Sequence, residues 1–216
     1  MPFNFDPNLQ LVFIRHGIPI NSNVIAGYTP GSEFDFPISR DGYSRIKALG
    51  NSLRSKHGNP AVMIYSPLQR TFQTAQAINE AYGKTIPMEE NYGLIDVQGH
   101  SLVGQSVEKF QDIQQGRISA NAEHPNSIVP RMLAVVEIAI RNHPGHTIFF
   151  VSHTEPIAEV LGKILKGVIG VGLPEYFLNR GQTYLVEYSS HGELLQAKKY
   201  LSAPGEGGFD PERGQY

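Results

Sequence analysis

The chain has 216 residues, which favours one compact domain because domains usually hold roughly 100 to 200 residues. Hydrophobic residues make up 40% of the chain and charged residues 18%, a balance that excludes wholesale disorder. The net charge of -2 excludes a broad basic surface for nucleic acid or acidic lipid. The absence of cysteine excludes disulfides, zinc-thiolate sites and thiol nucleophiles.

The two ends of the chain carry no pattern of a packed element. Residues 1–10 are polar and lack the regions of a signal peptide, and no apolar run is long enough to cross a bilayer. These features predict a soluble protein of the cytoplasm. Residues 202–216 are rich in Gly and Pro, and we expect this tail of a single domain, 1–216, to be mobile or to lie across a neighbour.

The first half of the chain alternates strands and helices. A β-prone run at 11–14 precedes an aperiodic stretch, 18–38, which is long enough to be a functional loop. An amphipathic helix is predicted over 41–57, and a strand over 62–65. A second helix is predicted to follow and to run to residue 82, with Ser66 as its N-cap, Pro67 at its first position and Gln69 completing a capping box.

The second half repeats this alternation. The predicted elements are an edge strand at 85–88, a helix from 126, a strand at 147–151, a helix after it, and two hairpin strands at 182–188 and 194–201. Three times a strand leads through a polar corner into a helix. The pattern predicts an α/β fold, a three-layer αβα sandwich with a mostly parallel central sheet, and places the ligand site outside the carboxyl ends of the strands.

Basic and hydroxyl side chains gather at three of these strand ends. Arg15 and His16 follow the first strand, Ser66 and Arg70 follow the second, and His153 follows the strand at 147–151. Carboxyl ends of parallel strands share one edge of a sheet, so these side chains are expected to line one pocket.

Such a pocket suits a phosphate group. Guanidinium groups match phosphate oxygens with a planar fork of donors, and helix N-termini add backbone N-H groups. Beside two such cations an imidazole is biased towards its neutral form, which leaves a ring nitrogen free to attack phosphorus. His16 is therefore a candidate nucleophile.

These motifs resemble those of a known family. The segment 11–17, which ends in Arg-His-Gly, together with Ser-Pro-Leu-Gln-Arg-Thr at 66–71 and Ser-His-Thr at 152–154, is similar in order and spacing to the histidine phosphatase superfamily, whose fold is phosphoglycerate mutase-like. The resemblance extends from about residue 10 to residue 200. It implies that His16 accepts the phosphoryl group, that Arg15, Arg70 and His153 bind it, and that no metal or other cofactor takes part.

The resemblance also implies a carboxylic acid that protonates the leaving oxygen, and two residues fit this role. Asp96 lies in Leu-Ile-Asp, followed by glycines, as the family acid often does. Glu89 is the competitor, because Glu89-Glu90-Asn91-Tyr92-Gly93 resembles the Glu-x-x-Tyr-Gly motif of the mutases. We favour Asp96 and keep Glu89 as the alternative.

The sequence departs from the family at positions that bear on the substrate. Ser22 stands where an asparagine often touches the phosphate, and Thr154 replaces the glycine that commonly follows the last histidine. We expect Arg15, Ser22, Arg70 and Thr154 to bind substrate. Specificity is expected to come from residues 18–38, 89–125 and 168–181.

The resemblance implies a metal-independent phosphatase that hydrolyses a small phosphomonoester through a phosphohistidine on His16. Two alternatives stay open, a phosphomutase of the same fold and a catalytically silent phosphate-binding protein. The expected partner is a small phosphorylated substrate, with neither nucleic acid nor membrane. The sequence leaves the oligomeric state open, a homo-oligomer included.

Overall fold

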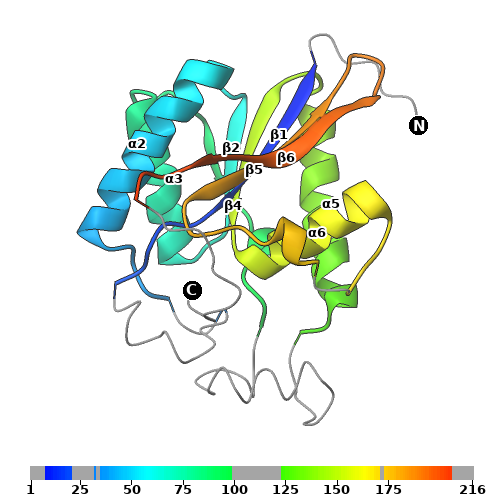
Figure 1. The fold of residues 1–216 in the computed structure, drawn as a ribbon, viewed down its shortest axis with the longest axis horizontal. Coiled ribbons are helices and arrows are strands. Elements are labelled where there is room, and N and C mark those ends of the chain that lie inside the picture. The colour runs from blue at the N-terminus through cyan, green and yellow to red at the C-terminus, as the bar shows by residue number, and fades with distance from the viewer. Residues whose placement is uncertain (1–7, 21–31, 33–34, 99–122, 171–172, 206–216) are drawn as a thin grey trace.

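The structure is a computed structural model that describes residues 8–20, 32, 35–98, 123–170 and 173–205. Its centre is a six-stranded sheet with the strand order β3-β2-β4-β1-β5-β6 (Figure 1). The strands are β1 (Leu9–Arg15), β2 (Val62–Tyr65), β3 (Met88–Glu90), β4 (Thr147–Ser152), β5 (Gln182–Tyr188) and β6 (Leu194–Ser202). The pairs among β1, β2, β3 and β4 are parallel, whereas β5 pairs antiparallel with both β1 and β6. The predicted mostly parallel sheet is confirmed.

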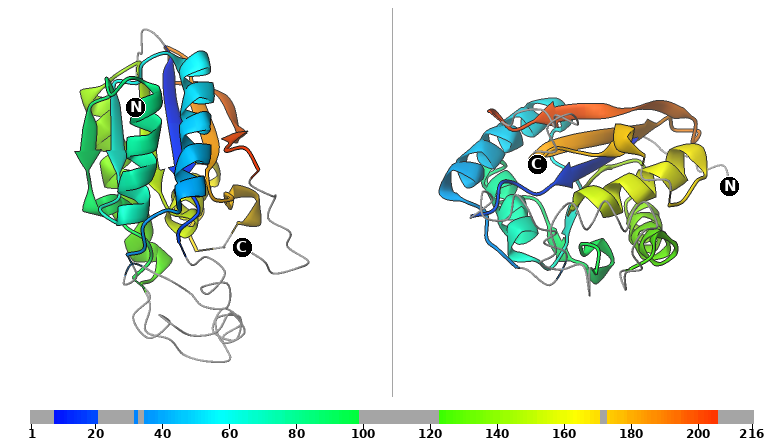
Figure 2. Two further views of the ribbon diagram at one scale, coloured as in Figure 1. Left: turned by 90° about the vertical axis from the view of Figure 1, so that its left-hand side faces the viewer. Right: turned by 60° about the horizontal axis from the view of Figure 1, so that its bottom comes forward.

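Within the described residues, four α-helices cover the sheet and two short 3-10 helices lie in its connections. The helices are α2 (Arg40–His57), α3 (Gln69–Ala81), α5 (Pro125–Asn142) and α6 (Thr154–Lys166), with η1 (Tyr92–Leu94) and η3 (Pro174–Tyr176) as the short ones. Figures 1 and 2 show α2 and α3 on one face of the sheet and α5 and α6 on the other. This is the predicted three-layer αβα sandwich.

Side-chain alternation along the strands divides the core into two layers. In β1, Leu11 and Phe13 pack with the α5 and α6 side, while Val12 and Ile14 pack with the α2 and α3 side. The central strands β1, β2 and β4 are apolar on both faces because both faces are covered. The buried sheet thereby holds the carboxyl ends of β1, β2 and β4 side by side.

Residues near in sequence cap three of the helix ends. Ser39 caps α2 by accepting a hydrogen bond from the backbone N-H of Gly42 at 2.9 Å. His124 caps α5 through its ring nitrogen, with Pro125 in the first turn. The last helix, α6, ends at Gly167, whose φ of 73° is the left-handed conformation that glycine adopts without strain.

The prediction for the start of α3 is wrong. The helix begins at Gln69, and its N-cap position is Leu68, which offers no side-chain hydrogen bond. The hydroxyl of Ser66 instead lies 3.0 Å from Nε2 of His153, and the side chain of Asp35 accepts a hydrogen bond from the backbone N-H of Gln69. A tertiary contact has replaced the local cap.

Two further expectations meet the structure in part. The edge strand after α3 is β3, which shares only Met88 with the predicted residues 85–88, because Pro87 lacks the N-H that a ladder needs. In the predicted tail, Ser202 ends β6 and Ala203 is buried. Residues 206–216 lie outside the described residues. Among the helices that the structure describes, none is long and apolar enough to cross a membrane.

Candidate active site

The first part of the site is the His16 corner, residues 15–17, where β1 ends. The backbone N-H of His16 continues the ladder to Ser152 O at 3.1 Å. The Gly17 N-H donates to Oγ1 of Thr74 in α3 at 2.9 Å. A Cβ on Gly17 would come within 2.7 Å of Ile46, so only glycine fits between β1 and α2. The corner is therefore fixed by backbone contacts.

The hydrogen-bond partner of the His16 ring shows which of its two nitrogens carries the hydrogen. Nδ1 lies 2.8 Å from the carbonyl oxygen of Gly17, and a carbonyl can only accept, so Nδ1 carries the hydrogen and Nε2 holds the lone pair. Burial first, and then the charges of Arg70, His153 and Arg15, lower the pKa of His16 well below 6.5. A buried neutral imidazole with an available Nε2 is a competent nucleophile.

The second part is the His153 corner, residues 152–154, between β4 and α6. The two imidazole rings face one another with centroids 5.2 Å apart. Nε of Arg70 donates to Nδ1 of His153 at 3.3 Å, which assigns the other hydrogen to Nε2, beside the hydroxyl of Ser66. Burial, and then the charges of Arg70, Arg15 and Arg131, lower the pKa of His153 well below 6.5.

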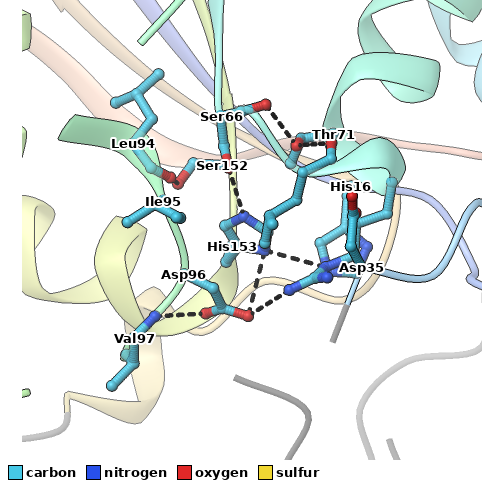
Figure 3. Close-up of polar contacts among 12 residues, drawn as sticks. His16, Asp35, Ser66, Thr71, Leu94, Ile95, Asp96, Val97, Ser152 and His153 are labelled. Carbon is cyan, nitrogen blue, oxygen red and sulfur yellow. Dashed lines mark hydrogen bonds and ion pairs between the residues drawn. The ribbon is translucent and has the colours of Figure 1, made fainter. Parts of the chain in front are cut away.

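Asp96 joins these groups from the segment after η1. Its Oδ2 accepts a hydrogen bond from Nη2 of Arg70 at 2.8 Å and lies 3.4 Å from Nδ1 of His153. Its Oδ1 accepts from the backbone N-H of Val97 at 2.9 Å. Figure 3 shows His153 and Asp96 joined by a dashed line, with His16 in the same view. A carboxyl group thus lies among two imidazoles and a guanidinium group.

Arg15 and Thr154 meet at the chain leading into β5. Nη1 of Arg15 donates to the carbonyl oxygen of Leu178 at 2.7 Å, and the hydroxyl of Thr154 donates to the same oxygen at 2.8 Å. The Leu178 N-H lies 3.1 Å from that hydroxyl. The extra hydroxyl of Thr154 is thus used to hold residue 178 against both corners.

The structure brings together His16, Arg15, Arg70, Asp96, His153 and Thr154. Glu89 does not belong to this group, because it lies exposed in edge strand β3, opposite Ile64. Ser22 and most of the predicted specificity segments lie outside the described residues. Within residues 8–20, 32, 35–98, 123–170 and 173–205, no group of three or more His, Cys, Asp or Glu side chains could hold a metal ion.

Two residues near the site were missed in the sequence. Glu155, half-buried in the first turn of α6, has its pKa raised from 4.5 to about 7, by burial first and then by the charge of Asp96. Arg131 in α5 donates to backbone oxygens of the segment that carries Asp96. An acidic residue next to Ser-His-Thr and a basic residue within an apolar helix were the available signals.

Comparisons with known proteins agree with this geometry. The model of the histidine phosphatase superfamily (branch 1) matches residues 11–199. A search of curated proteins finds no significant match.

Solved structures share the fold at low identity. A mycobacterial hydrolase is 16% identical, with a TM-score of 0.74, over 90% of this chain and 98% of its own. The mycobacterial glucosyl-3-phosphoglycerate phosphatase in complex with VO3 is 17% identical, with a TM-score of 0.73, over 90% and 99%. A phosphoglycerate mutase from Bacillus anthracis is 16% identical, with a TM-score of 0.71, over 91% and 94%. The family match over nearly the whole chain, joined to this fold, shows that the protein belongs to the histidine phosphatase superfamily.

Proposed function

We propose that this protein is a metal-independent phosphatase that hydrolyses a small phosphomonoester through a phosphohistidine on His16. The observation that carries the proposal is the ring of His16, whose Nδ1 lies 2.8 Å from the Gly17 carbonyl oxygen, so that Nε2 keeps its lone pair. That nitrogen belongs to a ring beside His153 whose pKa is lowered by burial first and then by the charges of Arg70, His153 and Arg15, which favours its neutral form.

In the first step, Nε2 of His16 attacks phosphorus and the bond from phosphorus to the ester oxygen breaks. Arg15, Arg70 and the His153 corner stabilise the charge on the phosphoryl oxygens. The carboxyl group of Asp96 donates its proton to the departing oxygen, which leaves as an alcohol. The products of this step are phospho-His16, ionised Asp96 and the free alcohol.

In the second step, Asp96 takes a proton from water as the water oxygen attacks phosphorus. The bond from phosphorus to Nε2 breaks, so neutral His16 and protonated Asp96 are restored and inorganic phosphate leaves. Arg70 links the two roles, because it contacts both Asp96 and His153. An incoming phosphoryl group competes with Asp96 for that guanidinium group.

A phosphomutase would use the same histidine, and a phosphoglycerate mutase is among the similar structures. A silent phosphate-binding protein would keep the cationic groups without turnover. Hydrolysis is favoured over silent binding because a carboxyl group for proton transfer lies among them. We place the protein in the cytoplasm, acting on a small phosphorylated metabolite.

A panel of phosphomonoesters, assayed with and without a chelator, tests the proposal. We expect release of inorganic phosphate from at least one substrate, unchanged by the chelator and inhibited by vanadate. Product analysis distinguishes phosphate release from phosphoryl transfer to a second position. Vanadate binding without turnover across the whole panel would instead favour the silent binding protein.

A further inference from the structure

The segment that carries Asp96, here named the acid segment, comprises residues 93–98. It begins within η1, and after Leu94 it has no helix or strand geometry in the described chain. Regular backbone hydrogen bonds therefore do not fix Asp96 in place. Its position depends on the contacts that the acid segment makes with neighbouring elements.

One side chain supplies several of these contacts. Nη1 of Arg131 donates to the carbonyl oxygens of Gly93 and Ile95, both at 2.8 Å. Nη2 of the same guanidinium group lies 3.4 Å from the backbone oxygen of Asp96. A single rigid fork from α5 thus spans three carbonyl groups around the acid, a geometry that lysine cannot reproduce.

The guanidinium group is itself fixed by Glu123. Nε and Nη2 of Arg131 bind the two carboxylate oxygens of Glu123 at 2.8 and 2.9 Å, and the two side chains are 19% and 10% exposed. Glu123 also pairs with the far end of the acid segment, since its N-H donates to Gln98 O at 2.8 Å and its Oε2 accepts from Gln98 N at 3.2 Å. Arg131 and Glu123 together hold both ends of the segment.

Close packing leaves the segment little room to shift. A Cβ added to Gly93 would lie 2.5 Å from Cγ2 of Val135 and 2.9 Å from the backbone oxygen of Arg131. On the opposite side, the hydroxyl of Ser152 donates to Leu94 O at 2.7 Å. The segment therefore lies directly between α5 and the end of β4, next to His153.

We propose that Arg131 is a positioning residue for proton transfer by Asp96, an inference that rests on the proposed function. An acid must reach the leaving oxygen within hydrogen-bond distance, and displacements of about 1 Å can cost on the order of 100-fold in rate. Arg131 is not assigned a contact with the phosphoryl group. It acts by holding the backbone from which the carboxyl group of Asp96 extends.

The test compares two substrates that differ in their need for an acid. p-Nitrophenolate leaves with little protonation, whereas the alkoxide of β-glycerophosphate must be protonated as it leaves. The value of kcat/KM includes only the steps up to departure of the leaving group. We expect Arg131→Gln to lower kcat/KM for β-glycerophosphate about 10- to 100-fold and that for p-nitrophenyl phosphate less than about 3-fold.

A control from the same helix is available. Arg141 is exposed near the end of α5, and its Nε donates to the Glu137 carbonyl oxygen of the same helix. Arg141→Gln should leave both values unchanged. Asp96→Asn is the reference variant. It should also lower kcat/KM selectively for β-glycerophosphate, and by a larger factor than Arg131→Gln does.

Equal losses on the two substrates for Arg131→Gln, or no loss on either, would overturn the positioning role. If Arg131→Gln shows no cooperative melting, the same ratio is measured for Arg131→Lys and for Glu123→Gln, each of which keeps part of the network. A selective loss supports the role, and its absence in both refutes it. Failure of the proposed function has a different signature, because Asp96→Asn would then lose no activity, or wild type would hydrolyse neither substrate.

Discussion

At the end of β1, the ring of His16 is held by one hydrogen bond to a backbone carbonyl, whereas at the end of β4 the ring of His153 contacts Ser66, Arg70 and Asp96. Both strands are parallel and both rings are buried, so burial does not distinguish the two corners. The difference lies in what the second nitrogen faces. One corner leaves a lone pair for a substrate, and the other organises the charged groups around it.

The largest expected effect follows from this contrast. His16→Ala removes the nucleophile and should lower kcat by about 10⁴-fold or more. His153→Ala removes one group that stabilises charge and should lower kcat by about 10² to 10³-fold. Steady-state kinetics on the best substrate of the panel, with thermal melting to verify folding, measures both. Equal losses at the two corners would contradict their different roles.

The next largest effect is expected from replacing the general acid, Asp96. Asp96→Asn should lower kcat/KM by about 10² to 10⁴-fold, because the amide cannot deliver a proton. Glu89→Gln serves as the matched control, since Glu89 lies exposed in β3. We expect the control to keep wild-type activity on the same substrate. Retained activity in the Asp96 variant would refute this choice of acid.

A smaller effect is expected from the hydroxyl that holds His153. Ser66→Ala leaves Nε2 of His153 without its 3.0 Å partner, which should cost about 1 to 3 kcal/mol of unfolding free energy. The freed ring should also lower kcat/KM roughly tenfold. Chemical denaturation and kinetics measure the two losses.

Ser44→Ala is the control for that variant, because Ser44 is exposed and its hydroxyl donates to the Arg40 carbonyl oxygen within α2. It should change neither the stability nor the activity. A Ser66 variant that matched it in both measurements would show that the His153 corner does not need this contact.

The smallest effects concern the pH dependence of the unfolding free energy. His16 and His153 have folded pKa values well below 6.5, so the unfolded chain binds protons first and stability is lost as the pH falls below 6.5. Glu155 has the opposite sign. Its folded pKa of about 7 exceeds 4.5, so the folded state holds the proton longer and stability is lost as the pH rises from 4.5 to about 7.

Denaturation of Glu155→Gln at about pH 5 and about pH 8 isolates the contribution of Glu155 to the pH dependence of the unfolding free energy. Relative to wild type, this variant should gain stability between the lower and the higher pH. Glu137→Gln, at an exposed position of α5, provides the comparison. A stability of Glu155→Gln that falls relative to wild type as the pH rises would show that the sign is wrong.

The sequence predicted most of the sheet and the convergence of the site for a simple reason. β1, β2 and β4 are apolar on both faces, and parallel strands bring their ends to one edge. His16 and His153 immediately follow such strand ends, and Arg70 lies one helical turn beyond another. Their proximity could therefore be predicted without knowing the conformation of the loops.

Elsewhere, tertiary contacts produce a structure that the local sequence pattern does not predict. Ser66 fits a helix cap by sequence, yet its hydroxyl contacts His153, a residue 87 positions away. The role of Arg131 depends on the shape of the acid segment, which has no periodicity to predict it. The sequence favoured Asp96 over Glu89 but left both open, because both residues follow the second arginine in plausible motifs. The structure adds that Asp96 contacts Arg70, whereas Glu89 is exposed in β3.

Phosphoenzyme trapping is the most direct test of the central claim that His16 carries the phosphoryl group. Wild-type protein mixed with a turned-over substrate and quenched rapidly should yield a phosphoprotein that is labile in acid and stable in base, with the phosphate mapped to His16. His16→Ala should yield none and should not turn over. A variant that retained normal turnover, or a phosphoryl group mapped to another residue, would contradict the account.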